Sequence, residues 1–227
     1  MITATTDIEV GLDCRGQTVV RRMYCEAPML VRVVDGIDPK GLTLAMVNGA
    51  AGPLGGDRLT FRLHVGQGSC VTVGSVAAAM AQPGPNRDHS ELLVEIVVAE
   101  GASLDWRPQP TVSVQGSDHR VDVRLSATGT STVAMREGVS LGRSGEPSGR
   151  FALHERVTID GVAVLDHETV FAPGALMGPG AQGSWRNLST EVLIGTDLPA
   201  PFVDIADQCV SALVHLSPNC ALSTSRC

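Results

Sequence analysis

Apolar and polar side chains alternate with a period of two residues over much of the chain. Every second residue is apolar in residues 59–65, and the same pattern recurs in 91–98 and 120–125. In an extended strand this period places the apolar set on one face and the polar set on the other. The pattern therefore predicts half-buried β-strands.

Glycine and proline clusters separate these segments and predict turns between them. The Gly66-Gln67-Gly68 turn predicts that residues 69–76 form the returning strand. Turn signals recur roughly every ten residues, which is typical of a continuous β-structure. Further strands are predicted at residues 18–21, 29–34, 103–106, 133–136, 151–159, 162–171 and 192–195.

Helical patterns are confined to two short segments. Residues 203–215 carry apolar side chains near helical spacing, with Asp204 and Asp207 in the first turns, where a helix dipole favours acids. Residues 75–81 are rich in alanine. We therefore expect an all-β (mainly β) fold with one or two short helices, one near the C-terminus. The weakest order is expected at 142–149, 174–183 and after Pro218.

Composition narrows the class of protein further. The 227 residues fit a single domain over 1–227, and 43% are apolar, which suffices for a sizeable core. Only 3% are aromatic, the net charge is −7, and no cluster of basic residues occurs, so no nucleic-acid partner is expected. No apolar run is long enough to predict a membrane span.

The cysteines and the first residues bear on location. The six cysteines include no C-x-x-C pair, so we interpret them as mostly reduced thiols, with Cys209 expected to be a small buried apolar residue. The N-terminal residues carry no secretory signal pattern. Both observations predict a cytoplasmic protein.

Patterns for several kinds of catalytic site are missing from the sequence. Neither phosphate-binding glycine motif is present, and the nearest match to a serine hydrolase elbow, Gly142-Arg143-Ser144-Gly145, is one residue short. No two histidines have a chelating spacing. His89, His119 and His167 each follow an aspartate, and we interpret them as solvated or hydrogen-bonded loop residues.

Three segments, taken in order, resemble one family. They are residues 48–57 (NGAAGPLGGD), 101–111 (GASLDWRPQPT) and 136–146 (REGVSLGRSGE). Their order and spacing are similar to those of the urease accessory protein UreD family, also called UreH, over about residues 18–171.

The resemblance implies an irregular, β-helix-like or stacked-sheet protein that acts as a scaffold and not as an enzyme. It implies three partners: the urease apoenzyme, UreF and the GTPase UreG. It also implies a chaperone-like role in nickel insertion, and hence in nitrogen metabolism, with nickel in transit and no tightly bound cofactor. The UreD-like component would contribute a passage for the metal.

The acids within the three segments are the candidates for lining such a passage. A path needs oxygen or imidazole ligands that release nickel, since a tight tetrahedral site would trap the ion. Asp57, Glu137 and Glu146 fit this need. Each also has a structural alternative: Asp57 could bind backbone amides in a turn, and Glu137 could pair with an arginine.

The other motif residues are expected to be structural. Gly55 and Gly56 would permit a backbone conformation that side chains forbid. Trp106 would cap a strand, and Pro108, Gln109 and Pro110 would shape a loop. Gly142 and Arg143 complete this structural set.

Two other functions stay open on the sequence alone. One is a hydrolase that uses Ser144 with a histidine. The other is a free-standing β-module that binds a metal or a small ligand such as a sugar.

Overall fold

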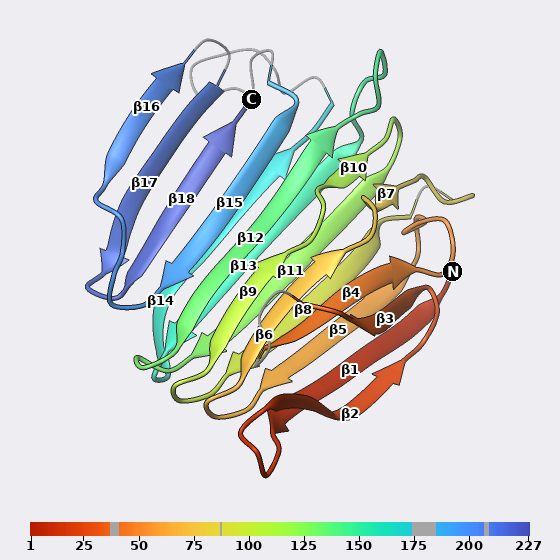
Figure 1. Cartoon of the computed structure of the whole chain (residues 1–227). Coiled ribbons are helices and arrows are strands. Elements are labelled where there is room, and N and C mark those ends of the chain that lie inside the picture. The colour runs from red at the N-terminus through yellow and green to blue at the C-terminus, as the bar shows by residue number, and fades with distance from the viewer. Residues whose placement is uncertain (37–40, 87, 174–184, 207–208) are drawn as a thin grey trace.

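The chain forms two β-sheets that stack face to face, and the strands of both sheets lie along roughly the same axis (Figure 1). The computed structural model describes residues 1–36, 41–86, 88–173, 185–206 and 209–227. These residues form strands, turns and irregular segments, with no helix among them. In particular, no described segment is a helix that could cross a membrane.

The first sheet has seven strands, and its edge strands are β14 and β2. In spatial order the strands are β14 (Val162–Phe171), β13 (Arg150–Ile159), β11 (Asp118–Ala127), β8 (Ser90–Val98), β5 (Arg58–Val65), β1 (Thr3–Leu12) and β2 (Thr18–Cys25).

The second sheet has eleven strands, and β16 and β3 are its edges. In spatial order its main path is β16 (Phe202–Ala206), β17 (Cys209–Ser217), β18 (Cys220–Arg226), β15 (Asn187–Ile194), β12 (Thr132–Leu141), β9 (Ser103–Arg107), β6 (Cys70–Ser75), β4 (Leu42–Asn48) and β3 (Met29–Val34). The short strands β10 (Thr111–Ser113) and β7 (Met80–Ala81) lie off this path.

The middle of the molecule is wound as a β-solenoid. Strands β5, β8, β11 and β13 are parallel in the first sheet, and β4, β6, β9 and β12 are parallel in the second. The chain alternates between the sheets, so each coil adds one strand to each layer. Parallel neighbours need a connection that brings the chain back to the starting end, and here the strand of the opposite sheet provides it.

A single apolar core fills the space between the layers. The inward residues follow the period-two pattern, as in β5, where Leu59, Phe61, Leu63 and Val65 are all buried. The ring of Phe61 meets the ring of Trp106 from the other sheet edge-on, with centroids 5.2 Å apart. The core is therefore formed by inward side chains from both sheets.

The predicted helix at 203–215 is wrong. The segment supplies β16 and β17, which pair antiparallel with Phe202 opposite Leu213. Val203 and Ile205 flank Asp204, so the same residues also satisfy a period of two, and β-branched residues favour strands. Because β17 also pairs with β18, the segment adopts the strand period of two and not the helical period.

The predicted helix at 75–81 is also wrong, and the turn before β6 has another role. Strand β6 ends at Ser75, and Met80–Ala81 pairs with β10 as the short strand β7. Seven residues are too few for a helix that no neighbour stabilises. The turn at 66–68 does not close a hairpin, because β5 and β6 belong to different sheets.

The segment after Pro218 is a strand and not a weakly ordered tail. Strand β18 lies between β15 and β17 and pairs with both of them. Residues 142–149, also expected to be weakly ordered, form a turn and an irregular segment between β12 and β13. The third such segment, 174–183, lies outside the described residues.

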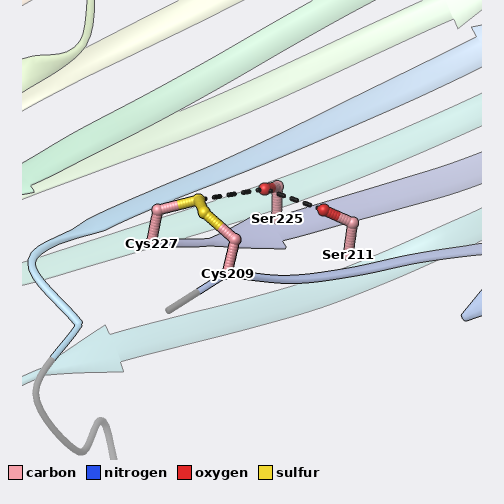
Figure 2. Close-up of a disulfide and its surroundings, with 4 residues drawn as sticks. All are labelled: Cys209, Ser211, Ser225 and Cys227. Carbon is pink, nitrogen blue, oxygen red and sulfur yellow. Dashed lines mark hydrogen bonds between the residues drawn. A yellow bond between two sulfur atoms is a disulfide. The ribbon is translucent and has the colours of Figure 1, made fainter. Parts of the chain in front are cut away.

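Two of the six cysteines, Cys209 and Cys227, are joined by a disulfide, which is an exception to the expectation of mostly reduced thiols. Cys209 begins β17, and Cys227 follows the end of the neighbouring β18, so the two residues face each other at the same end of the strand pair. Figure 2 shows their disulfide, with the Ser225 and Ser211 hydroxyl groups beside it. Cys209 is therefore a cross-link and not an apolar filler. Sequence alone could not pair it, because its neighbour in space lies 18 residues away.

Candidate functional site

Glu137 points into the space between the two sheets. The inward residues of β12 include Val133, Met135 and Val139, all buried, and Glu137 continues that series. Strand β9 runs parallel to β12 with Met135 opposite Trp106. This register brings the Trp106 Nε1–H to Glu137, where it donates to Oε1 at 2.7 Å. Strand periodicity thus places a carboxyl group in an apolar interior.

Glu155 faces Glu137 from the other sheet. It lies on β13 between the inward residues Leu153 and Val157, and its side chain is fully buried. The Thr190 hydroxyl on β15 donates to Glu155 Oε1 at 2.8 Å. The second oxygen, Oε2, is buried and has no hydrogen-bond partner among the described residues. An unpaired buried oxygen is costly, so it marks a position where a ligand would be favourable.

Burial sets the electrostatics of this carboxyl pair. Removal from water is the main cause that raises the pKa of Glu137 to about 8; the Trp106 hydrogen bond opposes the rise, and the charge of Glu155 adds to it. Burial likewise raises the pKa of Glu155 to about 7, against the hydrogen bond from Thr190. The two acids therefore hold protons near neutral pH and repel each other when both are charged.

A cavity of about 90 Å³ reaches Glu137. Its wall is mainly apolar and includes the thioether side chains of Met29 and Met46. The remaining lining residues are Leu30, Val47, Asn48, Phe61, Ser75, Ala77, Ala79, Leu92, Val94, Trp106, Pro108, Gln109 and Thr111. A small ion or molecule that enters this cavity meets the Glu137 carboxyl group in a mainly apolar wall.

The arrangement suits transient rather than tight cation binding. Two carboxylates offer oxygen ligands, and a divalent cation would supply the partner that Glu155 Oε2 lacks. The described residues contain no group of three or more His, Cys, Asp or Glu side chains that could hold a metal ion together. A pair without a third ligand can release what it binds.

Asp57 lies apart from this pair, in the turn that precedes β5. It is buried, and its Oδ1 accepts the Ile2 N–H at 2.7 Å while its Oδ2 accepts the Leu54 N–H at 3.0 Å. These contacts match the structural alternative, a carboxylate that binds backbone amides in a turn. A metal contact at Asp57 stays a prediction.

Glu146 lies in the turn after β12 and is held by two partners. Arg143 Nε donates to Glu146 Oε2 at 2.5 Å, and the Gln115 N–H donates to Oε1 at 2.9 Å. These hydrogen bonds lower the pKa of Glu146. Gly142, directly before Arg143 in the sequence, has a φ of +77°, a conformation that favours glycine. A metal contact at Glu146 also stays a prediction.

Gly55 and Gly56 lie where side chains would not fit. A Cβ on Gly55 would approach the Asp88 carbonyl oxygen to 2.3 Å and the Gly84 nitrogen to 2.5 Å. Gly56 has a φ of +95°. Together they let the 48–57 loop pass close to the backbone of Gly84 and Asp88.

The Pro-Gln-Pro segment separates two hollows. Pro108 and Gln109 line the cavity that reaches Glu137. Pro110 belongs to a second cleft, of about 340 Å³, together with Arg107 and Arg136. Trp106 does not cap a strand: it lies within β9 and is buried in the core.

Ser144 does not form a hydrolase site with a histidine in the described part of the chain. It is exposed in the turn after β12, and no described hydrogen bond joins it to an imidazole. No observation therefore favours a serine hydrolase.

Glu155 is the functional candidate that sequence reasoning missed. Its signal is present in the sequence, because Phe151, Leu153, Val157 and Ile159 alternate as inward residues and Glu155 occupies the position between them. A carboxyl group in an inward position of an otherwise apolar series is a marker for a buried site.

Comparison with known proteins finds one family to which this chain is similar. The family model described as UreD urease accessory protein matches residues 4–226. A urease accessory protein UreD from Frankia alni is 41% identical over 160 residues, which cover 70% of this chain and 51% of that protein. UreD from Streptomyces coelicolor is 35% identical over 173 residues, or 76% of this chain and 65% of that protein. UreD 3 from Streptomyces griseus is 35% identical over 188 residues, or 81% of this chain and 70% of that protein.

The matched part is shorter than each of these relatives. The chain spans about half the length of the Frankia alni protein and 65% of the Streptomyces coelicolor protein.

Proposed function

The chain belongs to the UreD family of urease accessory proteins, and from this premise we propose that it acts in urease maturation as a scaffold without catalytic activity of its own. The observation that carries the proposal is the family match over residues 4–226, which includes both sheets and the buried carboxyl pair. We propose the cytoplasm as the location of this role.

The partners we propose are the urease apoenzyme, the helical protein UreF and the GTPase UreG. Support comes from family membership and from the names of the relatives, which describe accessory proteins of urease. The absence of a phosphate-binding glycine motif in the sequence agrees with a separate protein that supplies GTP hydrolysis.

Nickel is the cargo in this proposal, and the interior of the β-solenoid is its route. Glu137 and Glu155 would bind the ion through carboxylate oxygens after giving up their protons. An incoming dication compensates the repulsion between the two charged acids, and two oxygens alone do not trap it. Asp57 and Glu146 are proposed as further contacts, each of which would exchange a present hydrogen bond for the metal.

Co-purification tests the scaffold role. We expect the tagged full chain, co-expressed with UreF and UreG homologues, to elute with both in one size-exclusion peak, because a scaffold must hold its partners together. Omitting UreF or UreG in turn shows which contact is direct. A chain that elutes alone in every combination would refute the scaffold.

A further inference from the structure

The two sheets end out of step with each other. Beyond the consecutive strands β12 and β13, the first sheet has one more strand, β14, whereas the second sheet continues through β15, β18, β17 and β16. Figure 1 shows β16 and β17 at that end of the second sheet. Among the described strands, β14 pairs only with β13 and β16 only with β17, so each has a free edge. The strands β16 and β17 therefore form an extension of the second sheet, past the last strand of the first.

The inward face of the second sheet loses its cover as it passes into this extension. On β15 the inward residues Thr190 and Val192 are buried. Residues that lie opposite each other in an antiparallel pair share a face, and the registers of β15, β18, β17 and β16 carry this face outward. On β17 it includes Val214, 49% exposed, and on β16 it includes Val203 and Ile205, 71% and 74% exposed. The face that is core in β15 is therefore open to solvent in β16.

The open face of the extension is apolar and held in place. Its members are Val203, Ile205, Val210, Ala212 and Val214. Pairing with β18 and the disulfide between the ends of β17 and β18 fix the extension to the rest of the sheet (Figure 2). A contiguous exposed apolar surface of this kind marks an interaction site.

Charged groups border the open face without entering it. Arg226 of β18 lies beside Val210, and its guanidinium group lies over the Trp185 ring. Asp166 and Glu168 point to the outer side of the first sheet, where arginines of β13 and β11 pair with them. Two such faces can therefore meet without bringing like charges into the apolar contact.

We propose that the open face of the extension binds the same face of a second copy of the chain. A two-fold axis parallel to the strands brings the extension of each copy into the space beside β14 of the other. Stacked sheets lie about 10 Å apart, so an extension one sheet thick fills the space beneath its counterpart. Each contact is then made twice, and the assembly closes as a dimer.

The free edges favour a second copy over another kind of occupant. In the dimer, β16 of one copy lies along the free edge of β14 of the other, so the unpaired backbone groups of both edges gain neighbours. A helix of a different protein could cover the apolar side chains but would leave both edges unpaired. The second copy satisfies the face and the edges together.

Sedimentation of the isolated full chain tests this proposal. We expect the wild type to form a dimer at micromolar concentration and to dissociate on dilution. V203D/I205D places four carboxylates in the dimer contact and should weaken association at least about tenfold, because buried charges without partners are costly. V76D is the matched control, since Val76 is 69% exposed and lies in the loop after β6; it should leave association unchanged. A wild type that stays monomeric, or a dimer that V203D/I205D does not weaken, would overturn the proposal.

Hydrogen exchange of the wild type alone gives a second readout that needs no variant to fold. Amides of β14 and β16 should exchange more slowly at the concentration where the dimer forms than after dilution, because both edges are then covered. Equal exchange in these strands at the two concentrations would overturn the proposed contact. Neither measurement involves urease, UreF or UreG, so failure of this inference leaves the proposed function standing.

Discussion

Raising the pH from 5 to 9 is expected to lower the free energy of unfolding by several kcal/mol relative to the isosteric variant E137Q/E155Q. The folded pKa values of Glu137 and Glu155, about 8 and about 7, lie above the ordinary value of 4.5. Between pH 4.5 and 8 the folded chain holds protons that the unfolded chain has lost. Unfolding then releases protons and becomes easier as the pH rises, by about 1.4 kcal/mol per unit of pKa difference.

Urea unfolding of the wild-type chain and the variant across this pH range measures the effect. Glutamine retains the oxygens that accept from Trp106 and Thr190 but does not titrate. The two proteins should have similar stability near pH 5, with the wild type the less stable above pH 8. The difference between them cancels the titration of other groups, including His119. Parallel curves across the whole range would show that the carboxyl pair is not buried as described.

Replacing Trp106 by alanine is expected to cost about 3–5 kcal/mol of folding free energy. The indole is buried between the sheets, packs against Phe61 and donates to Glu137. Its loss leaves both a large hollow and a buried carboxyl oxygen without its donor. Chemical unfolding of the variant measures the sum of these losses.

Two variants separate the causes. Trp106→Phe keeps most of the packing and removes only the donor, so we expect a cost of about 1–3 kcal/mol. Val162→Ala alters an apolar residue that is 65% exposed and should stay within about 0.5 kcal/mol of the wild type. A Trp106→Ala cost no larger than that of Val162→Ala would contradict the interior position of Trp106.

The strands of the solenoid could be predicted because local alternation survives in the fold. Residues 29–34 and 162–171 were predicted as strands and are strands β3 and β14 with those bounds. Alternation fails where a polar residue faces inward, as Thr6 does in the unpredicted β1. It is also ambiguous where apolar residues fit both periods, as in 203–215.

Pairing between distant segments could not be predicted. The turn at 66–68 suggested a hairpin, whereas the solenoid joins β5 to β8 and β6 to β9 through parallel contacts. The same holds for the candidate site. Glu137 was identified within its motif, but its neighbour Glu155 comes from the opposite sheet, and only the stacking of the layers brings the two acids together.

Polar residues in inward positions of the strands form a different set from the acids that were chosen for their motifs. Glu137, Glu155 and His119 each interrupt a run of apolar inward residues, in β12, β13 and β11 respectively. His119 is thus buried in a strand and is not the loop residue expected from the sequence. Asp57 and Glu146, chosen for the motifs in which they lie, are occupied by backbone amides and an arginine. In an all-β protein, an acid on the buried side of a strand marks a candidate site independently of any motif.

The nickel content of urease made in a host that lacks its own urease genes is the most direct test of the proposed role in urease maturation. Urease subunits are co-expressed with UreF and UreG homologues, with and without this chain, and the nickel bound per active site is determined together with urease activity. We expect loaded, active urease only when the chain is present. Equal nickel loading and activity without the chain would contradict it.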